Sequence, residues 1–97
     1  MSPDIFELTG FQRDILYVVA GLGELSGQAI KDELQKEVGD IGHGRLYPNL
    51  DTLVERGFVD KGSIDRRTNA YRITEEGLAE LERRREWENR YVTFDDS

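Results

Sequence analysis

The 97-residue sequence has no cysteine, one histidine, two prolines and only three lysines. The absence of cysteine excludes a disulfide framework and a thiolate site, and one histidine cannot assemble a zinc site of the usual kind. No apolar run reaches 18 residues, and the N-terminus lacks the basic and apolar regions of a signal peptide. We therefore expect a single cytoplasmic domain over residues 1–97, with no membrane association, metal or cofactor.

Acidic residues outnumber basic ones, 20 to 13, and give a net charge of −7. Such a balance argues against a nucleic-acid partner. The charges are unevenly distributed, however. Residues 43–72 hold six bases and four acids, a net of +2, whereas the rest of the chain carries −9. The acid therefore lies mostly outside one candidate binding segment.

Ten of the thirteen bases are arginine. An acid-rich, lysine-poor composition resembles that of proteins from a cytoplasm kept at very high salt, as in haloarchaea. An ordinary acidic protein of a mesophile is the other reading of the same composition.

Capping signals divide the first half of the chain. Thr9 with Gln12 predicts a capping box at the start of a central helix, and Ser26 predicts the start of a second helix. Residues 1–8 are expected to be a loosely held arm with enough apolar surface to dock. A third helix begins either at Gly42 with a bend or at Pro48, because a proline in a helix interior removes an amide donor.

The stretch from Gly42 to Arg72 predicts a helix, a strand, a polar tip and a second strand. Leucines at helical spacing form one apolar stripe, and Gly57 follows as a helix stop. Residues 58–62 and 70–73 read as strands around a tip that contains Arg66 and Arg67. A helix that leads into a two-stranded hairpin with an arginine tip is typical of a winged helix-turn-helix.

Three motifs in this stretch resemble the PadR-type winged-helix transcriptional regulators. They are Gly44-Arg45-Leu46-Tyr47-Pro48, Gly57-Phe58-Val59 after spaced leucines, and Tyr71-Arg72-Ile73-Thr74-Glu75-Glu76-Gly77. The resemblance covers roughly residues 8–82. It implies an α+β, mostly helical fold, with three helices, a two-stranded wing and a C-terminal helix over 74–94 for dimerisation. It also implies that the LYP segment is helical. Members of the family often carry a longer C-terminal helical domain than this chain does.

The predicted recognition helix supplies side chains suited to base edges. Arg45 and Asn49 lie four residues apart on one face, where arginine can pair with guanine and asparagine with adenine. Arg66 and Arg67 suit a minor groove or phosphates, and by resemblance Tyr47 can donate its hydroxyl to a phosphate. A solvated helix face and a solvated turn are the alternatives. The complete set of candidate DNA-binding residues is Gln28, Lys31, His43, Arg45, Tyr47, Asn49, Thr52, Arg66, Arg67 and Asn69.

The last predicted helix carries aromatic residues on one side and Leu78, Leu81 and Val92 on roughly the opposite side. A monomer would expose the aromatic side, so we expect a homodimer in which the N-terminal arm contributes to the interface. The candidate dimerisation residues are Ile5, Phe6, Trp87, Tyr91 and Phe94. A small-molecule effector is possible, but no residue pattern supports one.

These observations predict a sequence-specific regulator that binds double-stranded DNA as a homodimer and represses transcription. A winged helix that binds a protein and never enters a DNA groove is the alternative, and the net charge favours it. An enzyme is the weakest reading, because His43 has no partner base or nucleophile.

Overall fold

The computed structural model describes residues 4–93, and the structural statements below concern this part of the chain. Within these residues, no helix is both long enough and apolar enough to cross a membrane. The elements, in chain order, are η1 (Ile5–Glu7), α1 (Gly10–Leu22), β1 (Leu25–Ser26), α2 (Gly27–Val38), α3 (His43–Glu55), β2 (Val59–Ser63), β3 (Asn69–Ile73) and α4 (Glu75–Asn89).

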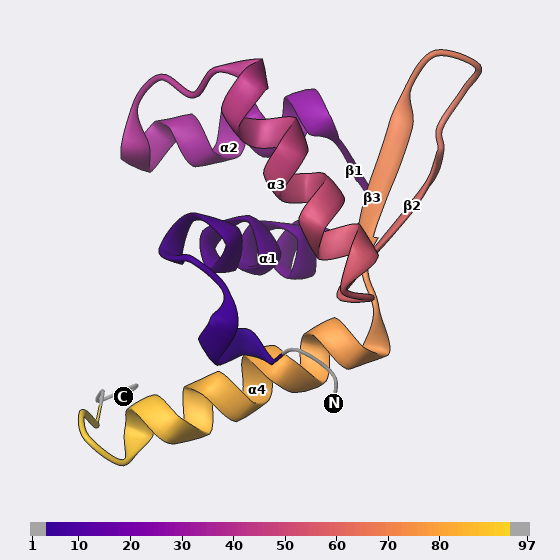
Figure 1. The fold of residues 1–97 in the computed structure, drawn as a ribbon. Helices are drawn as coiled ribbons and strands as arrows, with labels where there is room; N and C mark the ends of the chain where they lie inside the picture. The colour runs from indigo at the N-terminus through magenta and orange to yellow at the C-terminus, as the bar shows by residue number, and fades with distance from the viewer. Residues whose placement is uncertain (1–3, 94–97) are drawn as a thin grey trace.

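Helices α1, α2 and α3 form a compact three-helix unit, with the hairpin of β2 and β3 projecting beside α3 (Figure 1). The predicted caps are confirmed. Thr9 and Gln12 form a complete capping box on α1, and the Ser26 hydroxyl accepts a hydrogen bond from the Ala29 amide. The buried face of α1 supplies Ile15, Leu16 and Val19, each with no exposed surface, so α1 is the central helix of the core.

The sheet has three strands in the order β1-β3-β2, with both pairs antiparallel. The sequence predicted only the two-stranded wing and missed β1. Strand β1 is two residues long and pairs Leu25 with Tyr71 and Ser26 with Ala70. Because β1 leads directly into α2, this pairing joins the base of the wing to the start of the second helix.

Helix α3 begins at His43 and contains Pro48 in its interior, which settles the start left open by the sequence. Its apolar stripe of Leu46, Leu50 and Leu53 is fully buried. After the helix, Gly57 adopts φ +82°, the left-handed conformation that glycine takes without Cβ strain. The Phe58 amide then donates to the Leu53 carbonyl, so the chain turns at once into the wing.

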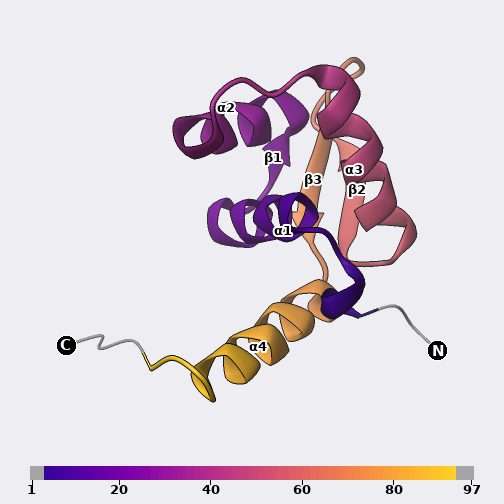
Figure 2. The same ribbon diagram turned by 60° about the vertical axis from the view of Figure 1, so that its left-hand side comes forward.

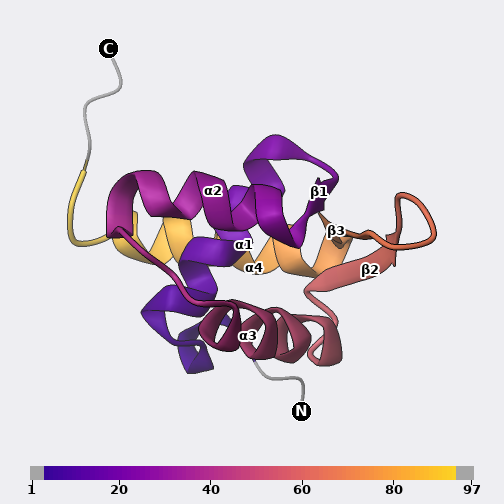
Figure 3. The same cartoon turned by 90° about the horizontal axis from the view of Figure 1, so that it is seen from above.

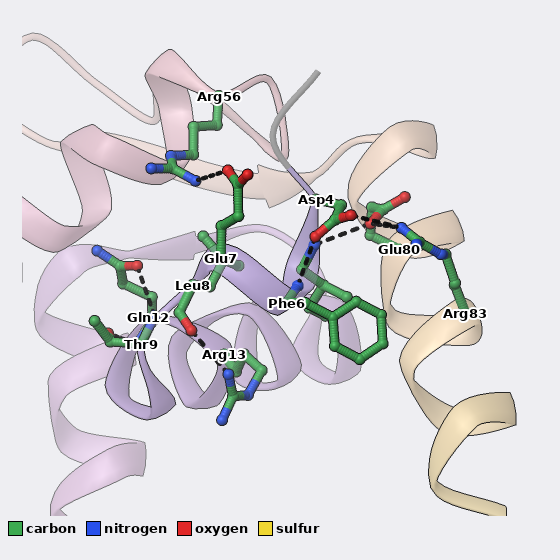
Figure 4. A network of polar contacts seen from close by, with 11 residues as sticks. Asp4, Phe6, Glu7, Leu8, Thr9, Gln12, Arg13, Arg56, Glu80 and Arg83 are labelled. Carbon is green, nitrogen blue, oxygen red and sulfur yellow. Dashed lines mark hydrogen bonds and ion pairs between the residues drawn. The ribbon is translucent and has the colours of Figure 1, made fainter. Parts of the chain in front are cut away.

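Residues 4–8, the described part of the expected arm, pack against the protein. Ile5 has no exposed surface and Leu8 is 4% exposed, so both belong to the core of the protomer. The Ile5 amide donates to Glu80 Oε1 of α4 at 3.0 Å, and Arg56, directly after α3, contacts Glu7 at 3.5 Å (Figure 4). The expected role of Ile5 in dimerisation is therefore wrong, because the side chain is buried within its own chain.

Helix α4 leaves the wing at Thr74, whose hydroxyl accepts from the Gly77 amide and donates to the Gly57 carbonyl. It runs along the far side of α1 from α2, and its C-terminal half extends away from the other helices (Figure 2). Leu81 is buried, but Leu78 and Val92 are 45% and 52% exposed. Of the three residues expected on the apolar side of this helix, only Leu81 packs against the core.

Candidate nucleic-acid interface

A polar depression of about 540 Å³ lies where α2, α3 and the wing meet. Viewed from above, α3 and the hairpin flank the start of α2 (Figure 3). The residues that line it are Ser26, Gly27, Gln28, Tyr47, Arg67, Thr68, Asn69 and Tyr71. Four of the predicted DNA-binding residues, Gln28, Tyr47, Arg67 and Asn69, are therefore brought together on one surface.

Tyr47 occupies the centre of this surface because α2 lets it approach. A Cβ atom added at Gly27 would lie 2.6 Å from the Tyr47 ring and hydroxyl, closer than side chains tolerate. On its other side, Tyr47 stacks with His43, with ring centroids 5.8 Å apart and planes at 11°. The depression thus combines the first turn of α2 with Tyr47 of α3.

The first turn of a helix carries amide groups without intrahelical acceptors and the positive end of the helix dipole. The depression includes such a turn, at Gly27 and Gln28, together with the Arg67 side chain. Burial raises the pKa of the buried Tyr71, and the nearby Asp51 carboxylate raises it further. Tyr71 therefore stays neutral at physiological pH. The helix turn and Arg67 suit a phosphate group, whereas the Asp51 carboxylate near Tyr71 opposes one.

The tip of the wing is held by Asp65. Its carboxylate accepts hydrogen bonds from the Arg67 and Thr68 amides at 2.8 and 2.9 Å, and those bonds lower the pKa of Asp65. Ile64 donates its amide to the Thr68 carbonyl and closes the loop. Arg66 and Arg67 are both exposed on this turn. The wing therefore presents two arginines on a turn of defined shape.

Arg45 and Asn49 do share one flank of α3, but that flank faces α1 and not the depression. The Arg45 guanidinium lies 4.0 Å from the centroid of the Phe11 ring. Asn49 accepts from Gln12 Nε2 at 3.0 Å and donates to the Arg45 carbonyl at 2.7 Å. Both ends of the Asn49 amide are therefore engaged within the protein, and the base-edge contact expected of Asn49 stays a prediction.

The other candidates are dispersed. Thr52 donates its hydroxyl to the Pro48 carbonyl, farther along the flank of Asn49. Lys31 follows Gln28 by one turn of α2. The second half of α3 exposes Asp51 and Glu55, so its charge is unfavourable for phosphate.

Ser26, Gly27, Thr68 and Tyr71 also line the depression, and the sequence did not identify them as site residues. Ser26 was recognised only as a helix cap. A cap residue at the start of the second helix of a helix-turn-helix is itself a signal for a phosphate-facing turn.

The described dimerisation candidates lie outside this surface, on η1 and at the C-terminal end of α4. Phe6 and Trp87 meet edge to face at 5.3 Å, and Trp87 meets Tyr91 at the same distance. Trp87, Glu88, Tyr91 and Val92 line a largely apolar hollow of about 520 Å³. Phe94 lies outside the described residues.

Several solved structures resemble this chain. RosR of H. salinarum, from a crystal grown from NaBr, is 44% identical over 96% of this chain and 86% of that chain, with a TM-score of 0.85. Bacillus subtilis PadR in complex with operator DNA is 25% identical over 92% of this chain and 53% of that chain, with a TM-score of 0.69. F93 from STIV, a winged-helix DNA-binding protein, shares the fold at 22% identity over 90% of this chain and 97% of that chain, with a TM-score of 0.70.

These similarities confirm the winged-helix fold predicted from the sequence. No curated protein sequence matches the chain. The model of the transcriptional regulator PadR-like family matches residues 15–83, which is most of the chain. A family of transcriptional regulators also confirms that the chain is not an enzyme. The chain therefore belongs to the PadR-like family of winged-helix, DNA-binding transcriptional regulators.

Proposed function

We propose that this protein binds double-stranded DNA sequence-specifically through the depression between α2, α3 and the wing, and that it acts as a homodimeric repressor that occludes a promoter. The observation that carries the proposal is the meeting of Tyr47, the first turn of α2 and Arg67 on one surface. The PadR structure with operator DNA supports it, since that relative shares the fold and a quarter of its residues.

In this docking, one DNA strand passes between α2 and the wing. The amides of the first turn of α2 and the side chains of Gln28, Tyr47 and Arg67 contact phosphates. The N-terminal end of α3 enters the major groove. Asp51 and Glu55 on the second half of α3 repel phosphate and keep that half farther from the DNA backbone.

The homodimer forms through α4. Trp87 and Val92 are 37% and 52% exposed and Tyr91 is 72% exposed, all around one apolar hollow. Contiguous exposed apolar surface of this kind marks an interface. A second copy of α4 is the occupant we favour, because a two-fold axis beside this helix would pair two recognition surfaces for a two-fold symmetric operator.

The charge distribution suits a cytoplasm of high salt. Residues 43–72, which include α3 and the wing, are net positive, whereas the rest of the chain carries −9. Screening at molar salt shortens the Debye length to about 3 Å and removes long-range repulsion, whereas contacts at touching distance persist. The 44% identity to a protein of H. salinarum is consistent with this environment.

The test is binding to DNA that flanks the protein's own gene, measured by gel shift and fluorescence anisotropy at molar KCl. We expect specific binding that the variant Arg66→Ala, Arg67→Ala weakens. The matched control is Lys36→Ala, Arg85→Ala, which removes two exposed bases that lie outside the depression. A wild-type protein without any DNA binding, or equal losses in both variants, contradicts the proposal.

A further inference from the structure

A chain of amide hydrogen bonds links the start of α1 to the recognition helix. The Thr9 amide donates to Gln12 Oε1 at 3.0 Å, and Gln12 Nε2 donates to Asn49 Oδ1 at 3.0 Å. Asn49 Nδ2 then donates to the Arg45 carbonyl at 2.7 Å. A backbone amide can only donate, so Thr9 fixes the orientation of the Gln12 amide, and Gln12 in turn fixes that of Asn49.

The chain ends at the part of α3 that needs support. Pro48 has no amide hydrogen, so the Gly44 carbonyl lacks its usual helical donor. The next carbonyl, that of Arg45, receives the Asn49 side chain. Stacking of Arg45 on Phe11 adds a second contact between α1 and the same turn. Side chains of α1 therefore hold the N-terminal half of α3 at the turn where its backbone bonding is weakest.

We propose that Gln12 is a positioning residue for DNA recognition. Besides capping α1, it fixes Asn49 and so holds the N-terminal half of α3 in the orientation that enters the groove. This role rests on the proposed function for its effect on DNA binding. Asn49, with both ends of its amide engaged, serves here as a structural link.

The substitution Gln12→Glu separates the two roles of this residue. A glutamate at this position keeps the capping box, because a carboxylate oxygen still accepts from the Thr9 amide. Its second oxygen faces Asn49 Oδ1, where a donor is required. If the Asn49 amide rotates, its oxygen meets the Arg45 carbonyl, so one hydrogen bond is lost in either orientation. Thr9→Ala is the complementary variant, since it removes the hydroxyl cap and leaves the Gln12–Asn49 bond in place.

Two measurements test the proposal. We expect Gln12→Glu to weaken binding to the operator about threefold to tenfold, as for the loss of one hydrogen bond. We also expect faster amide hydrogen exchange at residues 45–50, with α1 unchanged. Thr9→Ala should lower the melting temperature and leave the dissociation constant unchanged well below the transition.

A double-mutant cycle with Asn49→Ala distinguishes positioning from added charge. If Gln12 acts through Asn49, Gln12→Glu has no further effect on DNA binding in the Asn49→Ala background. An equal loss in both backgrounds means that the negative charge alone repels DNA, and it overturns the proposal. So does unchanged exchange at residues 45–50. If the wild type binds no DNA, the proposed function fails, while the exchange measurement still decides whether Gln12 holds α3.

Discussion

The ring of Phe6 meets the indole of Trp87 edge to face, with centroids 5.3 Å apart and planes at 79°. This contact ties the N-terminal segment to α4, together with the ion pair between Asp4 and Arg83 at 3.2 Å (Figure 4). Phe6 covers only part of the aromatic surface, because Tyr91 beyond it remains 72% exposed. The uncovered part is the surface that we assign to the second protomer.

The double variant Trp87→Glu, Tyr91→Glu should therefore be monomeric. Placing charge in an apolar interface costs several kcal/mol, more than a small dimer contact can offset. Analytical ultracentrifugation should show a species of 11.2 kDa instead of twice that mass. Val38→Glu, at an apolar position on α2 that is 48% exposed, serves as the control and should stay dimeric. A dimeric double variant would place the interface elsewhere.

Gly27→Ala should weaken DNA binding with little loss of stability. The added methyl group would lie 2.6 Å from the Tyr47 ring, so the ring must move out of the depression. Alanine otherwise stabilises relative to glycine by about 0.4–1 kcal/mol, because it restricts the unfolded chain. Anisotropy and thermal melting measure the two effects. Tyr47→Phe, which removes only the hydroxyl, should cost about 0.5–1.5 kcal/mol of binding if that group contacts a phosphate. If both variants bind DNA with full affinity, Tyr47 does not contact the DNA.

The wing variant Arg66→Ala, Arg67→Ala should lose affinity for all DNA sequences alike. Arginines on an exposed turn are placed to contact phosphates, which carry no sequence information. Binding isotherms on operator and unrelated DNA over a salt series would show this uniform loss and a salt slope reduced by about one for each phosphate contact removed. A selective loss on the operator would instead indicate base reading by the wing.

The turn at the wing tip should weaken in acid. The Arg67 and Thr68 amides stabilise the charged form of Asp65, so its folded pKa lies below the ordinary value of 3.8. A depressed pKa contributes stability above 3.8 that is lost as the pH falls through the folded value. NMR titration of the Arg67 and Thr68 amides should therefore give a midpoint below 3.8. In Asp65→Asn that titration step should be absent, and a midpoint at or above 3.8 would refute the assignment.

Binding should depend weakly on salt in the molar range, or strengthen with it. An ordinary DNA-binding protein loses affinity steeply because bound phosphates release cations. Here each protomer also brings a net charge of −7, whose repulsion is screened by added salt. The same screening should raise the melting temperature. Dissociation constants and melting curves in a KCl series measure both. A steep loss of affinity between about 0.1 and 1 M, with a flat melting temperature, would exclude adaptation to high salt.

Much of the fold could be predicted because its signals are local. The structure confirms three predicted helix boundaries. Two are side-chain caps, at Thr9 with Gln12 and at Ser26, and the third is the left-handed backbone of Gly57. The leucine stripe of α3 likewise follows from helical spacing. The family motifs supplied the helical conformation at Pro48, which local rules alone left open.

The remaining features depend on contacts between distant segments. Helical spacing shows which side chains of α3 leave the core, but not which of them then meet α1. Asn49 was therefore predicted to face a partner, and its hydrogen bond with Gln12 was missed. Strand β1 is too short to produce an alternating pattern and exists because β3 pairs with it. Ile5 was predicted to lie at a surface, because a short arm gives no periodicity that reveals its burial.

The pairing of β1 with β3 also constrains how the chain folds. The hairpin of β2 and β3 can form early because its strands are close in sequence, but Leu25 meets Tyr71 only after α2 and α3 have been synthesised between them. Closing the long loop between β1 and β3 costs chain entropy before the contacts that stabilise the pairing can form. The sheet therefore completes only when the three-helix core condenses around it. On the ribosome, this domain should remain open until β3 has emerged, and then close cooperatively.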